Sequence, residues 1–287
     1  MGAYRKRRVI RRKRPIRRRY GRRRATAKPR RAYVSRKRLL DITSVKKHDN
    51  MRPMVRNPDS TITPGPITVG TGFASLYMPS ARAFSTIDYA ESHRTKQSTY
   101  SVGYKETLAI NCTSGGIWKW RRVVFSTKDP AFYNQTGDAL PWIDQSTGDV
   151  GNMARSITLL PTSQYVRVRD LLYDGQEGVD WNDQFTAKVD TTRVTLHSDR
   201  IVTINPGNET GKALSRKFFY RTGKNLVYDD DEAGASKAVS YTSVGSKLGM
   251  GNLMVYDVVL LVVPPNLGVA PASMLFAPEG TYYWHER

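Results

Sequence analysis

The residues with the most distinctive chemistry in this sequence are the lysines and arginines of its first 38 positions. The whole chain has 46 Lys and Arg and 25 Asp and Glu, a formal net charge of +21. Twenty of these cations precede Leu39 and no acidic residue precedes Asp41, so the rest of the chain carries 46 − 20 = 26 cations against 25 anions, a net of +1. The excess charge therefore belongs to an N-terminal arm, residues 1–38. The cations of the arm are Arg5, Lys6, Arg7, Arg8, Arg11, Arg12, Lys13, Arg14, Arg17, Arg18, Arg19, Arg22, Arg23, Arg24, Lys28, Arg30, Arg31, Arg36, Lys37 and Arg38.

Cations at this density suit a polyanionic partner. Lys and Arg that neutralise phosphates release condensed counterions from nucleic acid, and Tyr20 lies among the charges, where its ring suits stacking on unpaired bases. Because the arm offers few apolar side chains to bury, we expect it to be disordered when free. Runs of Lys and Arg also serve as nuclear-import signals, and a merely solvated tail is the alternative without a ligand. We predict nucleic-acid binding, with recognition by a nuclear import receptor overlaid on it.

The rest of the chain lacks the residue patterns of common catalytic sites. Residues 207–212 are one spacer short of a phosphate-binding loop, and Ala213 follows where that loop has Ser or Thr. Cys112 falls on the predicted core face of a strand, which favours a structural thiol over a nucleophile. We therefore predict that the protein is not an enzyme and has no cofactor or metal site. The histidines are scattered without a zinc-site spacing: His48, His93, His197 and His285.

Four consecutive carboxylates form the other concentrated charge. Asp229, Asp230, Asp231 and Glu232 offer the hard oxygen ligands that calcium prefers. Their spacing is not that of a dedicated calcium loop, and neighbouring residues of a strand point to opposite faces. We therefore predict a loop surface, either solvated or in contact with basic residues of a neighbouring subunit.

Two strands and a glycine turn are the clearest elements of the body. Residues 98–112 alternate apolar and polar residues, with Glu106 as the only break, and residues 117–125 follow a Ser-Gly-Gly turn. This pattern predicts a β-hairpin. In the second strand Trp118 and Trp120 share the core face. Lys119 and Arg121 then face the other side, toward solvent or nucleic acid.

Further apolar segments extend the β pattern along the body. Residues 184–204 predict two strands joined by a bulge or turn at 190–192, and residues 254–263 predict a central strand buried on both faces. Residues 162–173 fit a helix or a strand, and residues 127–160 predict a long surface excursion. Strands without intervening helices indicate an antiparallel sandwich or barrel. We predict an all-β fold, an eight-stranded antiparallel jelly-roll sandwich with long loops, over residues 39–287.

The composition also sets the expected compartment. A single cysteine excludes an internal disulfide framework. The start of the chain lacks the pattern of a secretory signal, and the longest apolar run, residues 253–265, is too short to span a bilayer and contains Asp257. We expect an intracellular product with no membrane partner.

Five segments in order along the chain resemble the capsid protein of genomoviruses, which are small circular single-stranded-DNA viruses related to geminiviruses. The matching region spans residues 39 to about 262, with a gap over 127–160. The segments are Ile42-Thr43-Ser44 with Lys46-Lys47, Trp118-Lys119-Trp120-Arg121-Arg122, Phe185-Thr186-Ala187-Lys188-Val189-Asp190, Asn225-Leu226-Val227-Tyr228-Asp229-Asp230-Asp231-Glu232 and Gly249-Met250-Gly251-Asn252.

The resemblance implies a structural protein of the virion, a jelly-roll coat subunit that self-assembles into a small icosahedral shell around single-stranded DNA. The smallest such shell (T=1) has 60 copies, and its subunits would enter the host cell nucleus. Two other classes stay open from the residues alone. One is a cellular nucleic-acid-binding β-barrel protein of ribosomal or chromatin type; the other is a viral replication enzyme, which the missing nicking and phosphate-loop motifs disfavour.

Overall fold

The computed structural model describes residues 36–86, 92–145, 153–266, 268 and 270–287, with side chains from Leu39 onward. By its contacts the chain divides into two units, Met1–Ile42 and Thr43–Arg287. The described part of the first unit is helix α1 (Arg36–Thr43), which runs one residue into the second unit. This helix was not predicted, and its first three residues fall in the predicted arm. The expected disorder of residues 1–35 lies outside the described residues.

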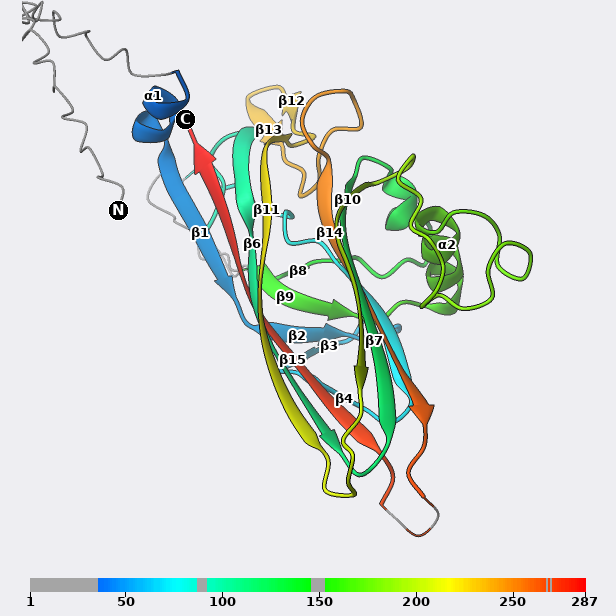
Figure 1. The fold of residues 1–287 in the computed structure, drawn as a ribbon. Coiled ribbons are helices and arrows are strands. Elements are labelled where there is room, and N and C mark those ends of the chain that lie inside the picture. The colour runs from blue at the N-terminus through cyan, green and yellow to red at the C-terminus, as the bar shows by residue number, and fades with distance from the viewer. Residues whose placement is uncertain (1–35, 87–91, 146–152, 267, 269) are drawn as a thin grey trace, which may run out of the picture. The chain divides into compact units, whose positions relative to one another are not determined.

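Residues 39–287, called the body from here on, contain two antiparallel sheets of long strands, all of them in the second unit (Figure 1). The first sheet has the order β1 (Val45–Met51), β15 (Ser273–Glu286), β6 (Ser98–Thr113) and β11 (Lys212–Val227), and the short strand β4 (Ile67–Val69) also pairs with β15. The second sheet has the order β10 (Thr195–Ile204), β7 (Ile117–Thr127), β14 (Asn252–Val263) and β5 (Gly72–Tyr77).

The order of these eight strands is that of a jelly roll. Numbered along the chain, the first sheet holds the first, eighth, third and sixth strands, and the second sheet holds the fifth, fourth, seventh and second. The chain therefore crosses repeatedly from one sheet to the other, as two Greek keys do when they are wrapped into a sandwich. The prediction of an all-β antiparallel jelly-roll sandwich is confirmed.

The predicted hairpin of residues 98–125 is wrong, although both of its strands exist. β6 pairs with β11 and β15 in the first sheet, whereas β7 pairs with β10 and β14 in the second. The turn between them is a corner of the sandwich, where Ser114 Oγ donates to the carbonyl of Pro271 at 3.1 Å. Gly116 allows the close approach, because a Cβ there would lie 2.8 Å from Ala272 Cβ and 2.9 Å from Leu261 Cδ1. Each strand buries its apolar row between the sheets, so the alternation identified both strands but not the sheet to which each belongs.

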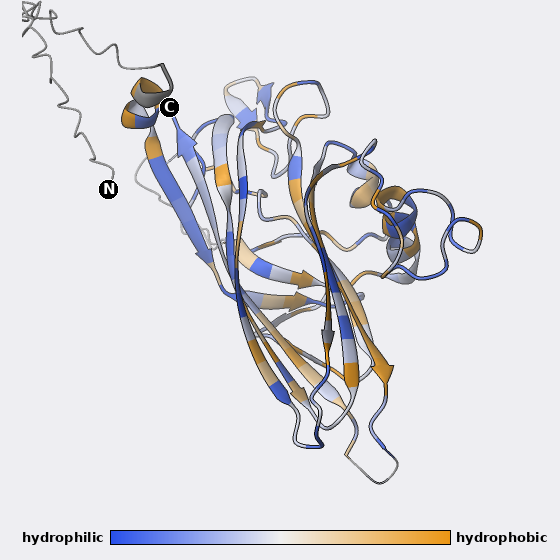
Figure 2. Cartoon of the chain, in the orientation of Figure 1, coloured by the Kyte–Doolittle hydropathy of each residue, from blue (hydrophilic) through white to orange (hydrophobic). Residues whose placement is uncertain are grey.

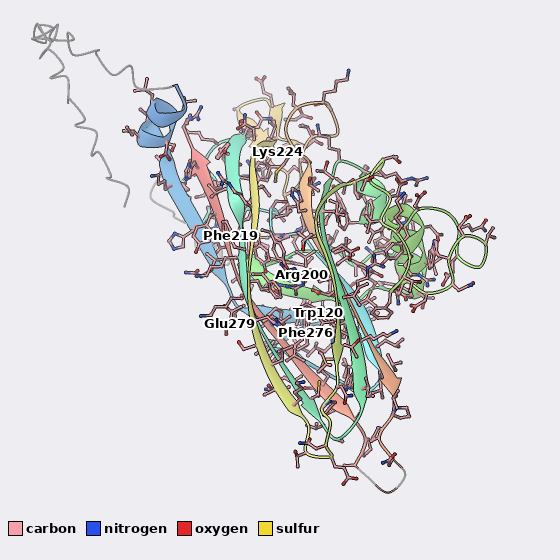
Figure 3. All side chains as sticks on the ribbon, viewed as in Figure 1. Trp120, Arg200, Phe219, Lys224, Phe276 and Glu279 are labelled. Carbon is pink, nitrogen blue, oxygen red and sulfur yellow. The ribbon has the colours of Figure 1, made fainter. Side chains whose placement is uncertain are left out.

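The core lies between the two sheets. Trp120 of β7 contacts Phe276 of β15 and Phe218 of β11, with ring centroids 6.4 Å and 6.0 Å apart. Figure 3 shows Trp120 and Phe276 between the sheets, whereas Phe219 and Glu279 lie on the outer side of the first sheet. The strands differ in hydropathy: β1 is almost wholly hydrophilic, whereas the C-terminal end of β14 is hydrophobic (Figure 2).

Shorter elements close the sides of the sandwich. The strands β3 (Ile62–Pro64), β2 (Pro53–Arg56), β9 (Met153–Thr158) and β8 (Ile143–Asp144) form a small sheet in that order, and β9 contacts both β1 and β5. Residues 162–173, whose pattern fits a helix or a strand, form helix α2 (Thr162–Leu172). It stands with the loop that follows it beside the second sheet (Figure 1). Elsewhere a 3-10 helix covers Pro130–Phe132, and β12 (Asp231–Ala233) pairs with β13 (Ser236–Ala238).

The remaining predictions for the second sheet hold in part. Of the two strands expected in residues 184–204, only the second forms, as β10, and the turn at 190–192 precedes it. β14 lies centrally, between β7 and β5, and is buried as predicted as far as Val259. Its end is exposed, with Leu260 45% accessible. No helix in the described part of the chain is long and apolar enough to cross a membrane.

Candidate functional site

Most of the predicted nucleic-acid-binding residues lie outside the described residues. Only Arg36, Lys37 and Arg38 belong to a described element, the first turn of α1, and there the backbone alone is described. The other 20 − 3 = 17 cations of the arm, and Tyr20, precede that helix. Their role stays a prediction.

The acidic run is not a uniform loop surface, because Asp230 is buried inside the subunit. Its carboxylate accepts two hydrogen bonds from the Arg94 guanidinium, from Nη1 and Nη2, both at 2.6 Å. Both side chains are fully buried. Lys237 Nζ lies 3.2 Å from the same carboxylate. The prediction that Asp230 meets a neighbouring subunit is therefore wrong, since its charge is balanced within its own chain.

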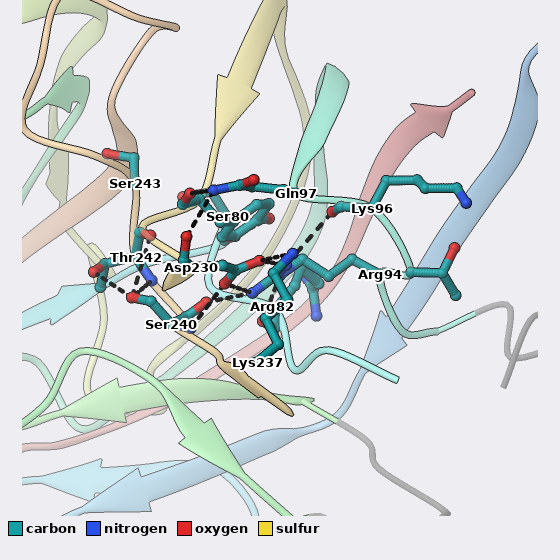
Figure 4. A network of polar contacts seen from close by, with 12 residues as sticks. Ser80, Arg82, Arg94, Lys96, Gln97, Asp230, Lys237, Ser240, Thr242 and Ser243 are labelled. Atoms are coloured by element: carbon teal, nitrogen blue, oxygen red, sulfur yellow. Dashed lines mark hydrogen bonds and ion pairs between the residues drawn. The ribbon is translucent and has the colours of Figure 1, made fainter. Parts of the chain in front are cut away.

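Arg94 is the centre of a network that fixes the segment around β12 and β13 (Figure 4). Besides Asp230, it donates to the carbonyl of Ser240 at 2.6 Å, and its guanidinium lies 4.0 Å from the centre of the Tyr228 ring. The backbone N–H of Ser240 in turn donates to Asp230 Oδ1 at 2.9 Å. Burial raises the pKa of Asp230, but the hydrogen bonds and charge of Arg94, the N–H of Ser240 and the hydrogen bond from Lys237 together outweigh burial and hold the pKa below the ordinary value. The pair therefore ties the ends of residues 230–240 together.

The other three carboxylates of the run are exposed. Asp231 and Glu232 belong to β12, and Asp229 borders a cavity of about 510 Å³. Aromatic side chains line that cavity, and two of them, Trp142 and Tyr241, stack with centroids 5.9 Å apart. Within the described residues no group of three or more His, Cys, Asp or Glu side chains is arranged to hold a metal ion.

Arg121 does not face solvent, so that part of the prediction is also wrong. It is 2% exposed on the outer side of β7, where the loop after α2 covers it. Its guanidinium donates to Asp199 Oδ1 at 3.0 Å and Oδ2 at 2.7 Å and to the carbonyls of Gln184 and Ala187. Lys119 is half-buried, with Nζ 5.6 Å from the centre of the Phe185 ring. On the outer face of the second sheet, Arg121 is thus covered and ion-paired and Lys119 contacts a ring, while Ile201 and Leu260 remain exposed.

Four charged residues that the sequence analysis did not single out as a site meet inside the sandwich. Arg122 donates to Asp257 from Nε at 2.7 Å and from Nη2 at 2.9 Å, and also to Glu106. Arg155 of β9 donates to Glu106 Oε2 at 2.9 Å and to Asp257 Oδ2 at 3.3 Å. All four side chains are fully buried. The cluster, called the interior quartet below, joins β6, β7, β9 and β14 with balanced charge.

The quartet explains why Glu106 interrupts the apolar alternation of β6. It occupies a core position, and its charge is compensated there. Burial alone would raise the pKa of Glu106, but Arg122 and Arg155 outweigh burial and keep its pKa below the ordinary value of 4.5. Burial also lowers the pKa of the two arginines, an effect that the nearby carboxylates reverse. A signal was present for Glu106, Arg122 and Asp257, which interrupt predicted apolar strands. There was none for Arg155, because its strand β9 lies in residues 127–160, which were predicted as a surface excursion.

The single cysteine is a core residue, as predicted. Cys112 is 4% exposed on β6, and burial raises the pKa of its thiol to about 11. The thiol is therefore protonated at neutral pH, which does not suit a nucleophile. Of the histidines, His93 is buried, and burial lowers its pKa. Lys47 Nζ donates to its backbone carbonyl at 3.1 Å.

The fold and its polar contacts define an antiparallel jelly-roll sandwich whose interior is crossed by ion pairs. No protein-family model matches the chain, and no curated protein matches it. Among solved structures it aligns with VP1 of the Trichodysplasia spinulosa-associated polyomavirus, at 9% identity over 85% of this chain and 93% of that one. VP1 of the same virus in complex with 3′-sialyllactose aligns at 9% identity over 84% and 76%. Both alignments have a TM-score of 0.11, which carries no argument about fold or function.

Proposed function

We propose that the protein is a viral capsid subunit that self-assembles into a small icosahedral shell and packages circular single-stranded DNA through its basic arm. The observation that carries the proposal is the separation of charge. Twenty cations precede Leu39, and the jelly-roll body that follows has a net charge of +1. Such a division suits a subunit whose body forms the shell and whose arm neutralises the phosphates of the enclosed nucleic acid. Jelly rolls are a recurrent fold of capsid proteins, although lectins and cupins share it.

The resemblance to genomovirus capsid proteins supports the same proposal, because its segments hold structural positions of the fold. Arg122, in the Trp118–Arg122 segment, belongs to the interior quartet, and the carbonyl of Ala187 in the Phe185–Asp190 segment accepts from Arg121. Asp230 anchors the Asn225–Glu232 segment through Arg94. Each of these three segments thus contains a residue with a buried contact in this fold, beside exposed residues such as Lys188 and Asp231.

Charge arithmetic gives the expected cargo. Closed symmetry is the usual outcome for identical self-assembling chains, and the smallest icosahedral shell, T=1, has 60 subunits. Sixty arms of 20 cations bring roughly 1,200 charges, each able to neutralise about one phosphate. With metal ions and polyamines balancing the remainder, we expect a genome of about one to three thousand nucleotides. A duplex suits so small a shell less, because its persistence length of about 50 nm resists coiling.

Electron microscopy of the purified, nuclease-treated full chain tests the proposal. We expect closed particles of uniform size that protect DNA sensitive to single-strand-specific nuclease. A protein that binds nucleic acid but never forms shells would instead favour the cellular nucleic-acid-binding alternative. Metal-dependent cleavage of DNA would favour a replication enzyme. The import role of the arm predicts nuclear accumulation of the subunit in cells, which is lost when the arginine runs are replaced.

A further inference from the structure

The outward side of the first sheet is less covered by other elements than the outward side of the second sheet. We call the outward side chains of β1, β15, β6 and β11 the open face. No other described element covers it. On the second sheet, by contrast, the loop after α2 covers Arg121, which donates to the carbonyls of Gln184 and Ala187. On β15 the odd-numbered residues of the open face are partly or fully exposed, and the even-numbered residues are buried.

Cations without acidic partners gather on the open face. Lys105 of β6 and Lys217 and Arg221 of β11 are exposed, and none of them forms an ion pair with a described residue. Glu279 of β15 is the one acidic side chain among the outward residues of the four strands. The net charge of +1 of the body is therefore unevenly distributed, because its exposed acids lie elsewhere, for example on β12.

Aromatic rings lie among and beside these cations. Phe219 is 54% exposed and is paired in register with Lys105. Its ring lies over Gly103, since a Cβ on that glycine would stand 3.1 Å from Phe219 Cζ. Across Gly103 in the same row, Tyr283 of β15 stacks on His48 of β1, with centroids 6.0 Å apart and planes 21° apart. The strands that carry Phe219 and Tyr283, β11 and β15, lie on either side of β6, with backbones about 10 Å apart.

We infer that the open face is a second nucleic-acid contact, which binds unpaired bases of the packaged strand. Bases would stack on Phe219 and Tyr283, while Lys105, Lys217 and Arg221 bind the adjoining phosphates. An exposed phenylalanine between unpaired cations fits a single strand better than a duplex, whose bases are not available for stacking. This surface has no polar groups arranged to hydrogen-bond the edges of particular bases, so we expect it to bind without sequence preference. The inference rests on the proposed function and assigns part of the body to it.

Photocrosslinking of the full chain to single-stranded DNA that contains 5-bromodeoxyuridine tests the contact directly. We expect crosslinked peptides that contain Phe219 or Tyr283, in addition to peptides from the arm. Crosslinks confined to residues 1–38 would overturn the inference and leave the proposed function intact. A full chain that binds no DNA at all would overturn both.

Matched variants of the full chain separate position from net charge. Replacing Lys105, Lys217 and Arg221 by Gln should reduce the slope of log K against log salt by about 2, because each lost phosphate contact contributes about 0.7 for single strands. The control replaces Arg52, Lys96 and Lys247 by Gln, three cations exposed in loops that likewise form no ion pair with a described residue, and should leave the slope nearly unchanged. Equal effects in both triple variants would show that only net charge matters, which would overturn the assignment.

The stacking role has its own pair of variants. Phe219→Leu keeps an apolar side chain but removes the ring, and should weaken single-strand binding about fivefold or more at salt concentrations that suppress the arm. Phe219→Tyr should retain the affinity of the parent chain. The same affinity in both variants would exclude a base stacked on Phe219. Thermal melting of each variant confirms that the fold is retained.

Discussion

At the scale of single residues, burial of paired charge is the feature that most clearly separates this body from a simple apolar sandwich. Glu106, Arg122, Arg155 and Asp257 lie in the core with complementary partners. The sequence indicated which strand positions face the core, as for Trp118 and Cys112. It did not indicate how the charged residues in the core are paired, because a buried ion pair joins residues far apart in the chain.

The pair of Arg94 and Asp230 gives the first stability prediction. Asp230→Asn should destabilise the body by about 3–5 kcal/mol, because it leaves the buried Arg94 guanidinium without a compensating charge. Asp231→Asn is the matched control, one residue along and exposed, and should change the free energy of unfolding by less than about 0.5 kcal/mol. Chemical denaturation of both variants measures the difference. Similar small effects would place Asp230 at a solvated surface after all.

Acid sensitivity is the second prediction, and its sign follows from Glu106. The pKa of this carboxyl is lower in the folded than in the unfolded chain, so its stabilising contribution is complete above about pH 4.5 and is lost as the pH falls further toward the folded pKa. Asp49 acts in the opposite direction, because burial raises its pKa.

Unfolding midpoints from about pH 7 to pH 3 for the parent chain and for Glu106→Gln isolate the contribution of Glu106. The variant should be less stable at neutral pH and should lose less of its stability in acid. Parallel curves for the two proteins would contradict the assigned shift.

At the scale of elements, local alternation identified strands but not their partners. β6 and β7 were predicted in nearly their observed positions, yet they belong to different sheets because a three-residue corner forms where a hairpin turn was expected. β1 was missed since its inward Lys47 and Asp49 are buried by pairing with Glu286 and Arg82 and not by apolar contact. β15 was also missed, and its alternating core residues are interrupted by Pro278 and Gly280.

The corner between β6 and β7 provides the third prediction. Gly116→Ala should destabilise the body by about 1–3 kcal/mol, because the added methyl overlaps Ala272 and Leu261. Gly245→Ala is the control, since a Cβ there meets no atom within 4 Å. It should be neutral or slightly stabilising through the unfolded chain. Thermal melting distinguishes the two, and equal midpoints would contradict the close approach at the corner.

At the scale of the whole molecule, the sequence supported the division between a charged arm and a neutral body but gave little of the surface chemistry of that body. The open face combines residues from four strands, and its side chains become neighbours only through the register of the first sheet. The same holds for the Arg94 network, whose members span residues 94 to 240. Features that depend on one segment could be predicted from the sequence. Sites that combine residues of several segments could not, because they depend on the strand order.

Deletion of residues 2–38 is the fourth prediction. It removes 20 cations and leaves a body with a net charge of +1, so the remaining chain should keep its β-rich circular dichroism spectrum and lose packaged DNA. The open face alone has too few cations to replace the arm. Nuclease-protected DNA per particle is the measurement. Undiminished DNA content would place the main binding site in the body, and an unfolded product would make the arm part of the fold.

The strand order of the first sheet also affects when the body completes its folding during synthesis. β1, the first strand of the body, pairs from Val45↔Glu286 to Met51↔Gly280 with β15, the last, which also separates β1 from β6. At about 5–20 residues per second, a ribosome needs roughly 10–50 s to produce the chain between them. Until then the first sheet lacks a central strand and β1 has no partner. A chain released early therefore cannot form this sandwich, so only fully translated subunits would be available for assembly.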